Sequence, residues 1–183
     1  MRVVVVGGGI VGLSTALLLL EQGFRHVKIV ADNFDDTTSH TAGAVWRPFS
    51  NAATPDRIME YVCLPIAWGH ETIVWLQGLL DAHGSTVVGV QKSPGTELHD
   101  VPTTTHPYWA HSVDGFRFLS ADEANQYGKA YGFEYTSLMI HSGVLMAWIT
   151  KQIHARGGTF ETRHLSSLDD LHNEGSDIIV NCS

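Results

Sequence analysis

The stretch that decides the fold is Arg2–Gly12, which reads RVVVVGGGIVG. Its four consecutive valines are typical of a strand covered on both faces of a parallel sheet. Residues 12–22, rich in alanine and leucine, then predict a helix that Gly23 ends in a left-handed conformation. A second apolar strand is predicted over 27–31. Strand, glycine turn, helix and strand together make one βαβ unit, whose crossover is right-handed.

The glycine turn carries the GxGxxG pattern, in which each glycine has a mechanical reason. Gly7 permits the tight turn, Gly9 lets backbone approach a pyrophosphate, and Gly12 lets the helix pack on the sheet. The helix start adds free N–H groups and a partial positive charge. Asp32 ends the second strand about 20 residues on, where a carboxylate binds a ribose diol and repels a 2′-phosphate. The predicted dinucleotide site comprises Gly7, Gly8, Gly9, Ile10, Val11, Gly12 and Asp32.

The pattern alone does not separate FAD from NAD, but the segment that follows it favours FAD. Thr37, Thr38 and Ser39 supply three adjacent hydroxyls, and 42–44 supply backbone with little side-chain cover. Such a stretch can bring N–H groups against a second phosphate and a flat ring. A simple NAD domain continues quickly into another βαβ unit, whereas this chain leaves the pattern for about a hundred residues. An NAD-dependent dehydrogenase stays the alternative.

Composition excludes several other classes of protein. The chain has 183 residues, 44% of them hydrophobic and 16% charged, which suits one globular domain plus part of another. A net charge of −8 argues against nucleic-acid binding and against docking on an anionic membrane. No run is long enough to span a bilayer, and no signal peptide is predicted. The eleven histidines show no paired-ligand spacing, so no metal site is predicted, and two distant cysteines disfavour a disulfide framework.

The predicted fold class is α/β, with a Rossmann-like FAD-binding domain interrupted by part of a mixed or antiparallel substrate domain. The FAD-binding domain is assigned to 1–50 and 142–183, and mixed helices with the start of the substrate domain to 51–141. Within that insertion, Pro65 is expected to split a helical segment in two. A strand is expected over 86–90 and a long loop over 91–112. Residues 120–123 fit a capping box that opens a short helix.

Several segments resemble D-amino-acid oxidases. The specific ones are 2–16, 30–49 (through VAD, TTS and AGAVWRPF) and the closing run Ile179-Val180-Asn181-Cys182-Ser183. Looser matches fall at 115–117, 135–138 and 148–150, so the resemblance covers the whole chain. It implies a flavoenzyme that holds FAD non-covalently and oxidises D-amino acids with O₂. The products would be a 2-oxo acid, ammonia and H₂O₂. D-aspartate oxidases are the alternative within the family.

The resemblance also assigns cofactor contacts by position. It implies that Gly8 to Gly12 wrap the pyrophosphate, that Asp32 holds the adenosine ribose and that Asn33 lies beside the adenine. The remaining implied contacts are Thr37, Thr38 and Ser39 to phosphate and ribityl groups, Gly43, Ala44 and Val45 to the flavin ring, the backbone of Leu165 to the adenine, and Ser183 at another point of the cofactor.

Two departures from the family matter. Arg47 stands where the family often has an uncharged residue, and we hypothesise that it contacts an anionic group of the substrate. The alternative is an arginine paired with a carboxylate of the protein. The family's substrate-carboxylate clamp follows the Asn181-Cys182 strand and has no counterpart here, so we expect a truncated or partial chain that alone is inactive. A non-catalytic FAD-binding module is therefore another alternative.

The cellular location and the partners of the protein are expected from the family resemblance alone. A peroxisomal location is expected in a eukaryote and a cytoplasmic one otherwise, without secretion. The expected partners are a D-amino acid substrate and O₂, and a homodimer is left open.

Overall fold

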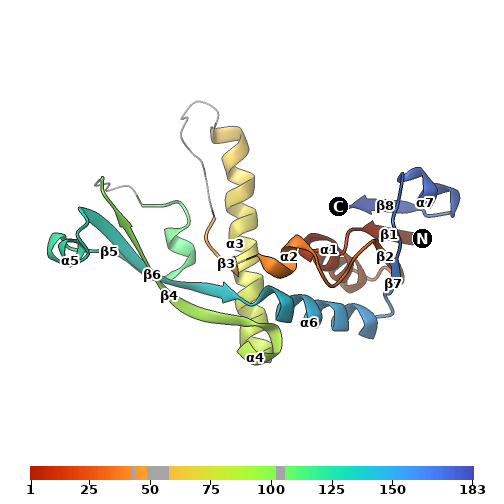
Figure 1. The fold of residues 1–183 in the computed structure, drawn as a ribbon, viewed down its shortest axis with the longest axis horizontal. Helices are drawn as coiled ribbons and strands as arrows, with labels where there is room; N and C mark the ends of the chain where they lie inside the picture. Colours follow the sequence, from red (N-terminus) through yellow and green to blue (C-terminus); the bar gives the residue numbers. More distant parts are fainter. Residues whose placement is uncertain (43, 49–57, 102–105) are drawn as a thin grey trace. The chain divides into compact units, whose positions relative to one another are not determined.

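The structure is a computed structural model that describes residues 1–42, 44–48, 58–101 and 106–183. Within 58–101, side chains are described from residue 67 onward. The chain forms two compact units (Figure 1). The first unit comprises Met1–Gly43, Val87–Gly89 and His141–Ser183. The second comprises Ala44–Thr86 and Val90–Ile140. The sequence-based division at 1–50, 51–141 and 142–183 stays a prediction about domains.

The first unit is built on a four-stranded parallel sheet of order β7-β2-β1-β8. Its strands are β1 (Arg2–Val6), β2 (His26–Ala31), β7 (Thr159–Thr162) and β8 (Ile178–Asn181). Helix α1 (Ile10–Glu21) links β1 to β2, so the predicted βαβ unit is confirmed. When the four strands are numbered by their order in the chain, their order across the sheet is 3-2-1-4. This is the strand order of half a dinucleotide-binding fold.

Valines of β1 form the core of this sheet on both of its faces. Val4 and Val6 pack with Val30 and with Leu171 of α7 (Asp169–Asn173). Val5 is fully buried, and α6 (Ser142–Ala155) packs against α1. Because helices cover both faces, the strand can be wholly apolar, as the sequence predicted. The short helix α2 (Thr38–Thr41), which was not predicted, also contacts α6.

The second unit is an antiparallel sheet centred on β6 (Tyr131–Ile140). Strand β4 (Val90–His99) pairs with β6 along its whole length. The other edge of β6 carries β5 (Asp114–Phe118) and β3 (Ala44–Val45). Helix α3 (Ile58–His83) packs against β4 and β6, and η2 (Ala110–Ser112) against β5. The predicted capping box is confirmed, since Ser120 caps α5 (Ala121–Gln126) and Glu123 returns the bond.

Three local predictions in the second unit and beside it were wrong. Helix α3 runs through Pro65 without interruption, because a proline removes one backbone donor and can kink a helix without ending it. The expected strand at 86–90 is instead α4 (Ser85–Val88). The first part of the expected loop, residues 91–99, belongs to β4, whose polar sequence with Pro94 gives no strand signal. A proline is tolerated there because β4 pairs on one side only among the described residues.

Candidate dinucleotide site

A cleft of about 710 Å³ opens at the carboxyl ends of the parallel strands of the first unit. It is lined by the residues that directly follow β1, β2, β7 and β8, together with the loop into α2. Strand β1 has β2 on one side and β8 on the other, so the order of strands reverses there. Ligands of open α/β sheets bind at this kind of switch point, outside the carboxyl ends of the strands.

Two glycines of the turn leave no room for a side chain. Gly7 has φ +122°, a conformation that other residues rarely adopt. A Cβ on Gly12 would lie 2.0 Å from the Gly7 carbonyl oxygen, so the close contact of helix and strand requires glycine. Gly12 therefore packs the helix, as the pattern predicted, and Gly7 exposes its backbone to the cleft.

The first turn of α1 is built to receive an anion. Gly9 is its N-cap residue, with no side-chain cap, and no acidic residue lies in the first turn. The N–H of Ile10 donates to Ser39 Oγ at 3.0 Å, so a hydroxyl lies directly over the helix start. Backbone amides, the helix dipole and hydroxyl groups are the donor set that holds a diphosphate. On these grounds the residues present fit the pyrophosphate of a dinucleotide.

Asp32 lies at the end of β2 with its side chain 71% exposed in the cleft. Its Oδ2 is 3.7 Å from Nδ1 of His164, which follows β7. Between exposed groups such a contact contributes little, so the carboxylate stays available to a ribose diol.

The loop after β7 was missed by sequence reasoning apart from Leu165. The N–H of Arg163 donates to the Ala31 carbonyl at 2.7 Å, which ties this loop to the end of β2. The Arg163 guanidinium bonds Glu174 at 2.6 Å, which raises the pKa of the arginine. The sequence shows two adjacent basic residues at 163–164, but only the strand order brings them beside Asp32.

Asn33 shapes the loop between β2 and α2. Its Oδ1 accepts the N–H groups of Asp35 at 2.8 Å and Asp36 at 3.0 Å, as in an Asx turn. The loop continues into α2, where the Thr37 N–H donates to Nδ1 of His40 at 3.3 Å. The expected place of Asn33 beside the adenine stays a prediction.

The structure brings most of the predicted cofactor residues together. Those that line the cleft are Gly7, Gly8, Gly9, Asp32, Asn33, Thr37, Thr38, Ser39, Leu165 and Ser183. Ile10, Val11 and Gly12 form the first turn of α1. Ala44 and Val45 form β3 of the second unit, and Gly43 lies outside the described residues. The roles of all these residues toward a cofactor stay predictions.

Arg47 belongs to the second unit and is paired there. Its Nε and Nη2 donate to the two oxygens of Glu97, and this contact raises the arginine's pKa. The Tyr135 hydroxyl donates to the same carboxylate at 2.9 Å; burial, then this bond, raise the pKa of Tyr135 to about 12. The Arg47 guanidinium also lies 6.0 Å from the centre of the Trp109 ring. This geometry favours the alternative of an arginine paired within the protein.

In the described part of the chain, no group of three or more histidine, cysteine, aspartate or glutamate residues is arranged to hold a metal ion. None of the helices described has the length and apolar character needed to cross a membrane.

The comparison with protein families decides the assignment. Residues 2–183 match the family described as DAO, FAD dependent oxidoreductase. The chain belongs to this family. Among curated proteins, this DAO-family chain is 32% identical over 182 residues to the D-amino-acid oxidase of Rubrobacter xylanophilus, covering 100% of the chain and 52% of that protein. It is likewise 32% identical over 186 residues to human D-aspartate oxidase, covering 100% of the chain and 52% of that protein.

The fold comparison agrees with the family. The FAD-bound L-α-glycerophosphate oxidase of Mycoplasma pneumoniae superposes with a TM-score of 0.61 at 15% identity, covering 87% of this chain and 44% of that one. The DAO-family fold class, an α/β unit with a parallel Rossmann-like sheet, is thus confirmed, and FAD is the family's cofactor. The chain spans about half the length of the curated relatives it matches.

Proposed function

We propose that the protein to which this chain belongs oxidises D-amino acids to 2-oxo acids, using FAD and O₂. In the overall reaction one amino acid, one O₂ and one water give the 2-oxo acid, ammonia and H₂O₂. The observation that carries the proposal is the glycine-lined cleft at the switch point of the parallel sheet, in a chain of the DAO family. FAD supplies the two-electron acceptor that the amino-acid side chains lack.

The residues of this chain would bind and orient the cofactor. Amides at the start of α1 and the Ser39 hydroxyl would hold the diphosphate, and the exposed Asp32 carboxylate would accept hydrogen bonds from the ribose. Leu165 would give an apolar wall to the adenine end of the cleft. These contacts position the cofactor and leave the electron chemistry to it.

Binding of FAD by the 183-residue chain tests the cofactor assignment directly. We expect FAD fluorescence to fall on saturable binding, while NADH at the same concentrations binds more weakly. Tighter binding of NADH than of FAD would favour the NAD-dependent dehydrogenase. FAD binding without H₂O₂ production from D-alanine is expected for this chain, because it spans about half of its relatives' length. Turnover at the rate of a complete oxidase would contradict that expectation.

D-aspartate oxidation is the second candidate, since human D-aspartate oxidase is as similar to this chain as the D-amino-acid oxidase is. The pairing of Arg47 with Glu97 supports a neutral substrate, because the guanidinium is already bound to a carboxylate. In the complete protein, R47Q should leave the affinities for D-alanine and D-aspartate unchanged. A selective loss of D-aspartate affinity would instead support the hypothesis that Arg47 contacts the substrate. A homodimer, and a peroxisomal or cytoplasmic location, stay predictions.

A further inference from the structure

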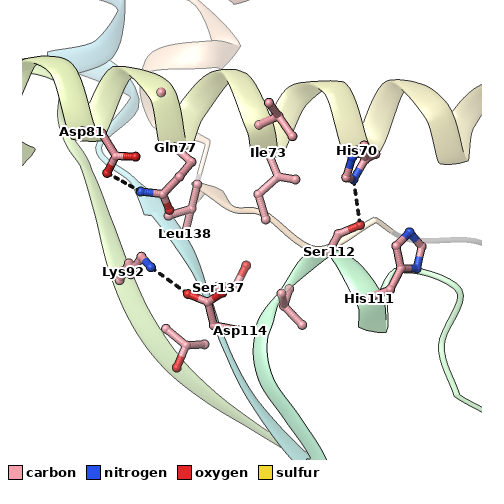
Figure 2. A pocket seen from close by; sticks show the side chains of 14 residues that line it. His70, Ile73, Gln77, Asp81, Lys92, His111, Ser112, Asp114, Ser137 and Leu138 are labelled. Carbon is pink, nitrogen blue, oxygen red and sulfur yellow. Dashed lines mark hydrogen bonds and ion pairs between the residues drawn. The ribbon is translucent and has the colours of Figure 1, made fainter.

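A second hollow lies in the second unit, between α3 and the antiparallel sheet (Figure 2). This groove has a volume of about 400 Å³, within the range of small-molecule sites. Side chains of α3 form one wall, and residues of β4, β5, β6 and η2 form the other. Ile73 and Leu138 face the groove from the two walls and give it an apolar middle.

A glycine of α3 keeps the groove open. Glycine destabilises a helix interior relative to alanine, so a helix interior glycine needs a local reason. A Cβ on Gly78 would meet no described atom within 4 Å, and Gly78 lies in the groove wall. The absence of a side chain at Gly78 therefore leaves open space in the groove wall.

One end of the groove carries an excess of negative charge. Lys92 Nζ bonds Asp114 Oδ2 at 2.7 Å, and Gln77 Nε2 donates to Asp81 Oδ1 at 2.7 Å (Figure 2). Two carboxylates thus face one ammonium group, and both raise the pKa of Lys92. A carboxylate has about four acceptor positions, so one bond to each leaves capacity for a further donor.

The other end of the groove is polar but carries no fixed charge. Nδ1 of His70 lies 3.2 Å from Ser112 Oγ, which links α3 to η2, and the ring of His111 lies beside that of His70 with centroids 6.0 Å apart. At a pH where imidazoles are neutral, the groove therefore has a single net negative charge at the Asp81 end. The chain's net charge of −8 adds to the attraction for a cation.

We propose that this groove binds a small primary alkylammonium ion. The ammonium donates to Asp81 and Asp114, and the alkyl chain lies along Ile73 and Leu138 in the space that Gly78 leaves. Charge complementarity excludes a carboxylate of the same length, and the apolar middle favours an alkyl chain over a bare inorganic cation. This site is separate from the dinucleotide cleft, which lies wholly in the first unit.

Titration of the 183-residue chain with n-hexylammonium chloride at pH 8, followed by ¹H–¹⁵N NMR, tests the proposal. We expect a dissociation constant on the order of 1 mM, as for a ligand with few heavy atoms. Shifts should cluster in α3, near Lys92 and in 112–114 and 136–138. Hexanoate at equal concentrations should cause no such shifts. Equal binding of hexanoate, or shifts confined to other residues, would overturn the proposal.

Two variants separate recognition from folding. D114N should weaken hexylammonium binding at least about 5-fold, while D122N, which neutralises an exposed aspartate on α5, should leave it unchanged. Gly78→Leu should fill the groove and weaken binding at least about 10-fold without lowering the melting temperature, since leucine favours the helix. Unchanged binding by Gly78→Leu would show that hexylammonium lies elsewhere and would refute the assignment.

Discussion

The two units of this chain build their functional surfaces from different materials. In the first unit the cleft is made mainly by backbone, at a glycine turn and at the ends of parallel strands. In the second unit the notable contacts are between side chains far apart in sequence, such as Arg47 with Glu97 and Tyr135 with Glu97. A backbone site tolerates no added atoms at its glycines, whereas a side-chain network depends on the chemistry of each partner. The following changes test this difference.

Gly12→Val should have the largest effect. Its side chain would be driven into the Gly7 carbonyl, which lies 2.0 Å from an ideal Cβ. We expect the free energy of unfolding to fall by about 3 kcal/mol and FAD binding to be lost. Urea unfolding and quenching of FAD fluorescence measure the two effects.

Gly23→Ala is the matched control for steric contact. Gly23 ends α1 with φ +90°, but an added Cβ meets no described atom within 4 Å. Only backbone strain remains, so we expect a loss of about 1 kcal/mol with FAD binding retained. Equal losses of stability and of FAD binding in Gly12→Val and Gly23→Ala would show that the close contact of α1 with β1 does not require glycine at position 12.

Asp32→Asn should act on binding and leave folding alone. Its carboxylate is exposed and makes one long contact, to His164, so stability should change by less than about 0.5 kcal/mol. Loss of charged hydrogen bonds to a ribose should weaken FAD binding about 10- to 100-fold by fluorescence titration. Asp35→Asn is the control, because the Asp35 N–H belongs to the Asn33 turn. It should change FAD affinity by less than about 2-fold. Equal losses in both variants would remove the ribose role from Asp32.

Glu97→Gln should destabilise the chain by about 2 kcal/mol, because it leaves the half-buried Arg47 guanidinium without its carboxylate. Glu134→Gln breaks an ion pair between exposed groups, 2.7 Å to Arg117, and should cost less than about 0.5 kcal/mol. Urea unfolding of E97Q and E134Q measures the two losses. Urea unfolding of R47Q, E97Q and the double variant measures the coupling between Arg47 and Glu97. A loss for Glu134→Gln as large as that for Glu97→Gln would contradict the contrast in burial.

The last effect is confined to high pH. The pKa of Tyr135 is raised to about 12 by burial and by its bond to Glu97, above the ordinary value of about 10. Between these values the unfolded chain has lost a proton that the folded chain keeps. The stability that this phenol contributes is therefore present below pH 10 and is lost as pH rises towards about 12. The difference in phenolate absorbance between wild type and Y135F should titrate near pH 12, and a midpoint near 10 would show that Tyr135 is exposed.

The sequence by itself determined the dinucleotide half of the molecule. Four valines, the GxGxxG turn and Asp32 predicted the βαβ unit, because each depends on local rules of strand burial, turn geometry and helix starts. The capping box at Ser120 was read in the same way, since its two bonds span three residues.

Only the tertiary structure decided the rest. It placed Arg163 and His164 beside Asp32 through the order of the parallel strands, which no local pattern encodes. It made a strand of the polar residues 90–99, because pairing with β6 satisfies a backbone whose side chains give no strand signal. It also paired Arg47 with Glu97, 50 residues away. Such contacts depend on where the chain returns in space, and neither periodicity nor residue spacing specifies that.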